Sequence, residues 1–442
     1  MGRADETSHA PTSGAHRVVD AVWRIESARL IAGLTRMIRD VGLAEDLAQD
    51  ALLAALEQWP ESGVPDNPGA WLMAIAKRRA VDFLRRQERL GRKIDELGHE
   101  LQAERDGAEP TLDEDIGDDL LRLMFISCHP VLSTEARVAL TLRLLGGLKT
   151  EEIARAFLVA ESTVAQRIVR AKRTLAEARV PFEVPQGAEL AARLLSVLEV
   201  LYLVFNEGYS ATAGDDWMRP ALCEEALRLG RILAELVAEE PEVHGLVGLM
   251  EIQASRSRAR IGPSGEPVLL LDQDRARWDH VLICRGLAAL DRAAALGGVP
   301  GPYALQGAIA ACHARARTPA ETDWTRIAAL YAALGQLAPS PVVELNRAVA
   351  VAMAFGPATG LPLVDELTCE PSLKDYHLLP SVRGDLLAKL GRHDEARSEF
   401  ERAASLTRNA RERTLLLERA AACAPPSHSA GSAGLLGGHL PR

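Results

Sequence analysis

A segregation of charge in the first third of the chain constrains its fold more than any other feature. From Asp95 to Asp119 the chain has eleven acidic residues and one basic residue, Arg105, so this segment carries a formal charge of −10. From Gly69 to Lys93 it has eight basic residues and two acidic ones. A stretch so acidic and so poor in apolar residues cannot bury enough surface to fold by itself. The pattern predicts an acidic linker, residues 91–119, between two packed modules.

Composition predicts that these modules are helical. Apolar residues make up 48% of the 442 residues but aromatic residues only 4%, and Ala, Leu, Arg and Glu dominate, as in α-helices. The six cysteines are scattered, without the spacing of a zinc site or a disulfide framework. The sequence contains neither a secretion signal nor a run of about 20 apolar residues that could span a membrane. We expect an all-α, cytoplasmic protein that needs no metal, no cofactor and no membrane.

Turn-forming and low-complexity segments predict where the modules end. The segment PFEVPQG, Pro181–Gly187, has two prolines and a glycine that cannot continue a helix, and it predicts a domain boundary. The last residues are rich in Gly, Ser, Ala and Pro, which predicts disorder. The expected order is a disordered N-terminus at 1–16, a helical module at 17–90, the acidic linker, a second helical module at 120–180, a long helical domain at 186–424 and a disordered tail at 425–442.

Helical spacing predicts an amphipathic helix over Ala44–Trp59 in the first module. Its packed face has Ala48, Leu52, Ala55, Leu56 and Trp59. Its outward face has Asp46, Asp50, Leu53 and Glu57. An ordinary amphipathic surface helix has the same pattern, so this helix alone does not indicate a function.

A loop at Pro60–Gly69 and a basic helix from Trp71 follow. The expected buried side of this helix has Met73, Ala76, Ala80, Phe83 and Leu84. The opposite side gathers Arg78, Arg79, Arg85, Arg86 and Arg89. Five guanidinium groups on one face repel one another unless an anionic partner neutralises them, so this face fits a DNA backbone or a solvated charged surface.

The second module contains a predicted helix-turn-helix over Leu148–Ala178. Thr150 can cap a short helix that turns Ile153, Ala154 and Phe157 inward. The packed face of a second helix, which begins near Ser162, has Val164, Ile168, Ala171 and Leu175. Its open face has Ser162, Thr163, Gln166, Arg167, Arg170 and Arg173. Such side chains can reach base edges and phosphates in a major groove, although a plain helical hairpin with a polar face fits the same spacing.

Together these segments resemble the two conserved regions of extracytoplasmic-function (ECF) sigma factors of the sigma-70 family. In that family region 2 has an AED…Q(D/E) helix and a WL…IA…DxxR helix, and region 4 has EEIA…(S/T)V…R…R. The chain carries these motifs in the same order, as Ala44-Glu45-Asp46…Gln49-Asp50, Trp71-Leu72…Ile75-Ala76…Asp82…Arg85 and Glu151-Glu152-Ile153-Ala154…Ser162-Thr163-Val164…Arg167…Arg170. The resemblance covers Val18–Arg179 and implies a region 2 helical bundle, the acidic linker and a region 4 helix-turn-helix.

The resemblance implies a factor that binds RNA polymerase core, through its β′ clamp and β subunits, and directs it to promoter DNA. The residues that would bind the core are Asp46, Gln49, Asp50 and Leu53. Those that would contact the −10 element are Asn67, Trp71, Arg78, Arg79, Arg85 and Arg86, with Asn67 as a reader of a flipped base. Those that would contact the −35 element are Ser162, Thr163, Gln166, Arg167, Arg170 and Arg173. Many members of the family have a glycine where this chain has Leu158 or Val159.

The remaining half of the chain resembles the subgroup of ECF factors with a tetratricopeptide-like extension. The clearest copy of the 34-residue repeat pattern has Gly384, Leu387, Gly391, Ala396, Phe400 and Ala403. A weaker copy runs through LNRAVAVAMAFG, where Ala348 lies 36 residues before Gly384. Stacked helix pairs of this kind bind proteins or peptides on a concave surface, so we expect a regulatory domain with such a partner. A helical domain without repeats is the alternative.

Other functions have less support in the sequence. The segment VLLLDQDRARWDH, Val268–His280, fits an ion-pair network better than a metal or catalytic site. We expect no enzyme, because the chain lacks a nucleophile–base pair, metal-ligand spacing and a phosphate-binding loop. The main alternative is a helix-turn-helix regulator with a ligand- or protein-sensing helical domain, and another is a tetratricopeptide scaffold that binds acidic proteins.

Overall fold

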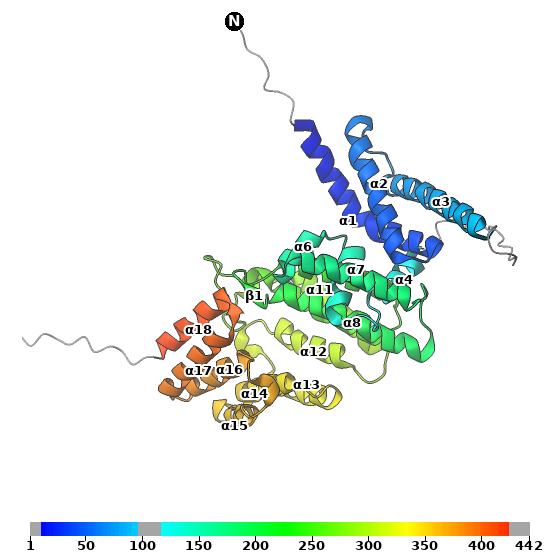
Figure 1. Cartoon of the computed structure of the whole chain (residues 1–442). Coiled ribbons are helices and arrows are strands. Elements are labelled where there is room, and N and C mark those ends of the chain that lie inside the picture. Colours follow the sequence, from blue (N-terminus) through cyan, green and yellow to red (C-terminus); the bar gives the residue numbers. More distant parts are fainter. Residues whose placement is uncertain (1–9, 96–115, 424–442) are drawn as a thin grey trace, which may run out of the picture. The chain divides into compact units, whose positions relative to one another are not determined.

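A computed structural model of the chain describes residues 10–95 and 116–423. This part of the chain forms eighteen α-helices and two very short strands, so the prediction of an all-α fold is confirmed (Figure 1). Residues 1–9, 96–115 and 424–442, which include most of the predicted linker and tail, lie outside the described residues. Helix α1 (Ala10–Ile38) begins within the segment 1–16 predicted to be disordered. None of the described helices combines the length and the apolar composition that a bilayer crossing requires.

The chain divides into two compact units. The first comprises Met1–Thr212, Met218–Ala259 and Asp274–Ala314. The second comprises Ala213–Trp217, Arg260–Gln273 and Arg315–Arg442. The predicted boundary at Pro181–Gly187 lies inside the first unit, because it is the connection between two helices that share one core.

The first unit begins with a packed group of three helices, α1, α2 (Val41–Ser62) and α3 (Pro68–Asp95) (Figure 1). Asp40 caps α2, since its Oδ1 accepts hydrogen bonds from the main-chain N–H of Gly42 and Leu43 at 2.8 and 3.0 Å. Alanines on one side of α2 are fully buried and allow close helix packing, whereas Met73, Phe83 and Leu84 of α3 are only half-buried.

Four helices form the second group, α4 (Ile116–Ser127), α5 (Thr134–Leu144), α6 (Thr150–Phe157) and α7 (Glu161–Glu177). The N-cap of α6 is Lys149 and not Thr150. The main-chain N–H of Lys149 donates a hydrogen bond of 2.8 Å to Oε2 of Glu152. Leu158 ends α6 in the left-handed conformation, with φ 50° and ψ 43°. The helix-turn-helix therefore forms without a glycine at its turn.

The first unit continues through α8 (Gly187–Tyr209), α9 (Pro220–Leu236), α10 (Pro241–Ser255), α11 (His280–Ala295) and α12 (Pro302–Arg315). Buried polar contacts fix α8 to α4 and the turn that follows it. Arg193 Nη2 donates to the main-chain oxygen of Phe125 at 2.9 Å, and Ser196 Oγ donates to that of Cys128 at 2.6 Å. One apolar core accordingly runs from Val19 to Met250.

The second unit consists of helix pairs. Its helices are α13 (Trp324–Leu337), α14 (Pro341–Phe355), α15 (Pro357–Leu367), α16 (Leu378–Lys389), α17 (His393–Leu406) and α18 (Ala410–Ala422), and β1 (Ala213–Gly214) pairs in parallel with β2 (Arg408–Asn409). Gly384 of α16 packs against Phe400 of α17, where an added Cβ would lie only 3.0 Å from the ring. This contact joins two positions of the predicted repeat.

Candidate nucleic-acid and polymerase interface

The four residues predicted to bind the polymerase lie along one side of α2. Asp46 and Asp50 are exposed, and Leu53 keeps 55% of its surface exposed. Gln49 is half-buried, and its Nε2 donates a hydrogen bond of 2.6 Å to Oε1 of Glu45. Two carboxylates beside an exposed leucine are complementary to a partner surface that has basic and apolar side chains.

Glu45 of α2 takes part in a buried cluster of charges. Its side chain is almost fully buried, and its carboxylate lies 2.6 Å from Nε of Arg143 on α5 and 2.5 Å from Nζ of Lys172 on α7. Burial by itself would raise the pKa of Glu45, but the two cations hold that pKa below its ordinary value. The charged triad thus joins the first helical group to the helix-turn-helix.

Exposed ion pairs connect the same two groups. Nη2 of Arg24 lies 2.9 Å from Oε1 of Glu152, and Nζ of Lys149 lies 3.5 Å from Oδ1 of Asp20. Pairs as exposed as these contribute about 0–1 kcal/mol each. The buried triad is therefore the stronger electrostatic contact between the groups.

Asn67 and Trp71 are at the start of α3. Oδ1 of Asn67 accepts a hydrogen bond of 3.0 Å from the main-chain N–H of Ala70, so this side chain caps the helix. Trp71 is half-buried, and its ring meets that of Trp59 edge to face with centroids 5.4 Å apart. Both side chains are held in place by local contacts.

The arginines of α3 differ in their surroundings. Arg78, Arg85 and Arg86 are exposed, whereas Nη1 of Arg79 lies 3.2 Å from Oδ2 of Asp50. The structure thus brings together a residue predicted to contact DNA and one predicted to bind the polymerase.

The second helix of the helix-turn-helix, α7, has the two faces that the spacing predicts. Val164, Ile168, Ala171 and Leu175 are buried, in agreement with that prediction. On the open face Ser162, Gln166, Arg170 and Arg173 are exposed, and Thr163 and Arg167 are half-buried. Arg173 pairs with Glu177 at 2.6 Å along the same helix surface.

Side chains of the segment Val268–His280 make local contacts. Asp274 accepts a hydrogen bond from the main-chain N–H of Ala276, and Asp279 caps α11. The guanidinium of Arg275 lies 4.9 Å from the ring centre of Trp278. No group of three or more His, Cys, Asp or Glu residues in the described ranges is placed to hold a metal ion.

Two family models match the helical groups described above. Residues 25–90 match Sigma-70 region 2, and residues 122–175 match Sigma-70, region 4. The chain belongs to the ECF sigma factors of the sigma-70 family. A third model, a family of unknown function (DUF6596), matches residues 193–294 of this sigma factor. The sigma-70 family is not an enzyme family, and its members act with RNA polymerase core on promoter DNA.

Proteins similar to this chain include an uncharacterized protein and two sigma factors. An uncharacterized protein of Rhizobium meliloti is 44% identical over 390 residues, which are 86% of this chain and 90% of the relative. The probable ECF RNA polymerase sigma factor SigI of Mycobacterium tuberculosis is 29% identical over 37% of this chain, and the match spans only 57% of SigI. The ECF RNA polymerase sigma factor SigK of a Mycobacterium species is 27% identical over 35% of this chain and 80% of SigK.

The sequence reasoning missed the triad formed by Glu45, Arg143 and Lys172. One signal was available, since Glu45 precedes Ala48 by three residues and Leu52 by seven and so falls on the packed face of α2. A carboxylate at such a position needs cations nearby. Which cations these are depends on the tertiary fold.

Proposed function

We propose that Asp46, Gln49, Asp50 and Leu53 of α2 dock this sigma factor on the β′ clamp of RNA polymerase core, while α3 contacts the −10 element and α7 the −35 element. The observation that carries the proposal is the open face of α7. Ser162 and Gln166 near the start of α7 can reach base edges. Arg167 and Arg170 can hold phosphates or contact guanine in two places.

Docking on the clamp would require this chain to break only weak ion pairs of its own. Asp50 pairs with Arg79, and Asp46 lies 3.9 Å from Nζ of Lys172. Both aspartates are exposed, so each pair contributes about 0–1 kcal/mol and basic residues of a partner can replace it. The exposed side chain of Leu53 would supply the apolar contact at the centre of this surface.

The C-terminal helical domain is proposed to regulate promoter use through region 4. Arg193 and Ser196 of α8 bond main-chain oxygens at the end of α4, and Arg228 Nη2 of α9 donates to the main-chain oxygen of Leu145 at 2.7 Å. These contacts tie the position of the helix-turn-helix to that of α8 and α9. A protein or peptide bound by the extension would act through the same contacts.

Run-off transcription with purified core polymerase tests the proposal. We expect specific initiation only when core and this protein are combined, and weak promoter binding by the protein alone. A helix-turn-helix regulator that acts without core would instead bind its DNA site alone. Absence of specific initiation from a library of genomic fragments would contradict the proposal.

Binding to core tests the docking surface separately. Leu53→Asp is expected to weaken core binding by about tenfold, because it removes an exposed apolar contact at the interface. Val281→Asp is the matched control, since Val281 is similarly exposed, at 61%, on α11. If the two variants bound core with equal affinity, Leu53 would not be part of the interface.

A further inference from the structure

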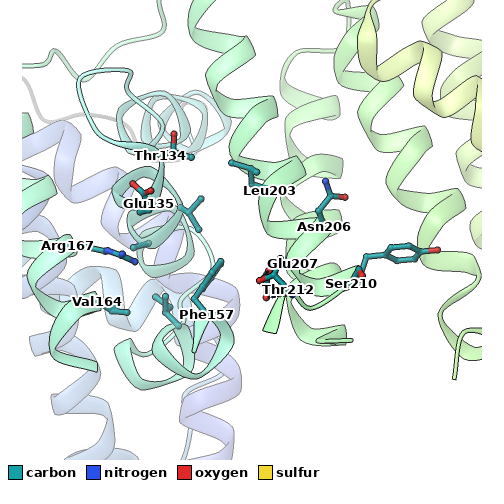
Figure 2. A pocket seen from close by; sticks show the side chains of 14 residues that line it. Thr134, Glu135, Phe157, Val164, Arg167, Leu203, Asn206, Glu207, Ser210 and Thr212 are labelled. Carbon is teal, nitrogen blue, oxygen red and sulfur yellow. Dashed lines mark hydrogen bonds between the residues drawn. The ribbon is translucent and has the colours of Figure 1, made fainter. Parts of the chain in front are cut away.

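A cavity of about 370 Å³ lies between the helix-turn-helix and α8 (Figure 2). Residues of α5, α6 and α7 form one wall, and the C-terminal half of α8 with the residues after it forms the other. Both walls belong to the first compact unit. Of the residues proposed above for clamp docking and promoter contacts, Arg167 alone is among those that line this cavity.

The surface that lines the cavity is mainly apolar. Val138, Ile153 and Val164 come from the core of the helix-turn-helix, and Phe157 is half-buried at its edge. Leu203 faces them from α8 with 37% of its surface exposed. Apolar side chains at the wall of an empty cavity have no atoms to contact on one side and so lose dispersion energy. An apolar ligand in the cavity would supply these contacts and would therefore bind favourably.

The charges around the cavity are balanced. Arg167 and Glu135 stand on the same wall and have opposite signs (Figure 2). On the other wall the carboxylate of Glu207 forms an ion pair with Arg219 and accepts a hydrogen bond of 2.9 Å from the hydroxyl of Thr212. A charged ligand would lose its water shell here and would face groups of both signs.

We infer that this cavity binds a small, uncharged, mainly apolar molecule that carries one or two hydrogen-bonding groups. The volume lies in the range of small-molecule sites, roughly 300–1,000 Å³. The amide of Asn206 and the hydroxyl of Ser210 line the cavity and supply uncharged donors and acceptors for the polar end. Arg167 stands on the wall, so the molecule also contacts a residue of the proposed −35 surface.

Binding of N-phenyl-1-naphthylamine to the full-length protein tests the site. This fluorophore is uncharged and apolar, and it has one N–H donor. We expect saturable binding of one molecule per chain, and Leu203→Trp should weaken it by about tenfold or more because the indole fills the space. Leu378→Trp is the matched control, since Leu378 is 38% exposed on α16 and does not line the cavity.

The outcomes separate clearly. Absence of saturable binding, or equal affinity of Leu203→Trp and wild type, overturns the inference. If Leu203→Trp loses helical signal in circular dichroism, Ser210→Met replaces it, because Ser210 is exposed, has extended backbone and lines the same cavity. Weaker binding by Ser210→Met then supports the site, and unchanged binding overturns it.

An effect of the bound molecule on transcription would rest on the proposed function, and it is measured separately from binding. Holoenzyme is assayed with and without saturating N-phenyl-1-naphthylamine, using wild type and Leu203→Trp. A change in run-off product with wild type but not with Leu203→Trp supports coupling through the wall that carries Arg167. Saturable binding without any such change overturns the coupling, and a wild type that is inactive both with and without the fluorophore contradicts the proposed function instead.

Discussion

Glu45 lies among alanines and leucines on the packed side of α2, where a carboxylate is costly unless cations neutralise it. The side chains of its partners Arg143 and Lys172 keep 20% and 19% of their surface exposed. The triad is therefore intermediate between a buried ion pair and a surface pair. Its role is to hold α2 against α5 and α7.

We expect Glu45→Gln to lower the free energy of unfolding of the first unit by about 2–3 kcal/mol. Breaking a fully buried pair costs about 3–5 kcal/mol, and the partial exposure of the cations reduces this cost. Thermal unfolding followed by circular dichroism measures the change. Asp46→Asn is the control, because the Asp46 side chain is 73% exposed and should contribute less than about 0.5 kcal/mol. Equal effects of the two substitutions would show that burial of the pair is unimportant.

The same triad makes stability depend on pH. The pKa of Glu45 is lower in the folded than in the unfolded protein, so its stabilisation is complete above the unfolded value of about 4.5 and is lost as pH falls through the folded value. The difference in melting temperature between wild type and Glu45→Gln should be constant near neutral pH and shrink in acid. A difference that widened in acid would argue against this assignment.

Arg167 and Arg170 carry the proposed −35 contacts of α7. Replacing either with Ala should weaken binding of the holoenzyme to its promoter by about 1–3 kcal/mol if that arginine contacts a base in two places, and by less if it contacts a phosphate. Titration on promoters with altered −35 sequences distinguishes the two cases. Arg397→Ala, a surface arginine of α17, serves as the control. If promoter occupancy were unchanged with both Arg167→Ala and Arg170→Ala, the proposal that α7 lies in the major groove would be wrong.

At the scale of elements, the turn between α6 and α7 has an unusual residue. Leu158 adopts a left-handed conformation, which costs a non-glycine residue about 1–2 kcal/mol, and its side chain is 52% exposed. Packing of α6 and α7 through Ile153, Val164 and Ile168 outweighs this cost. A glycine would form the same turn without it.

Leu158→Gly should therefore stabilise the first unit by about 0.5–1 kcal/mol, because the relief of backbone strain exceeds the added entropy of the unfolded chain. The melting temperature should rise. Ala165→Gly, at an exposed position within α7, should lower stability by about 0.5–1 kcal/mol and so controls for the effect of glycine itself. A fall in melting temperature with Leu158→Gly would mean that the leucine side chain makes a stabilising contact.

The periodicity of apolar residues made the helices predictable. The ends of the helices and their long-range contacts could not be predicted in this way. Val164, Ile168, Ala171 and Leu175 are buried as their spacing predicts, since one packed face per helix suffices for this inference. The cap at Lys149 and the left-handed Leu158 depend on backbone geometry that composition does not encode. Glu45 and Arg143 are 98 residues apart, beyond the reach of any local pattern.

For the whole molecule, region 4 and the extension share a core. Leu194, Val197, Leu198 and Leu201 of α8 are buried in the same cluster as residues of α4 and α5. The segment Pro181–Gly187 interrupts the helices but does not separate two cores. Removing the extension at this point would expose an apolar surface of region 4 to water.

Two truncations test this arrangement. A chain that ends at Pro185 should melt at lower temperature than the full chain and aggregate more readily, and it should lose −35-dependent transcription, because α8 and α9 no longer cover α4 and α5. Its α2 surface is unchanged, so binding to core polymerase should persist. A chain that ends at Ala314 keeps the whole first unit and should retain the stability of region 4. Calorimetry, light scattering and core pull-down compare the three proteins. If the chain that ends at Pro185 proved as stable as the full chain, α8 and α9 would be dispensable for the fold of region 4, and regulation by the extension would have to act through another contact.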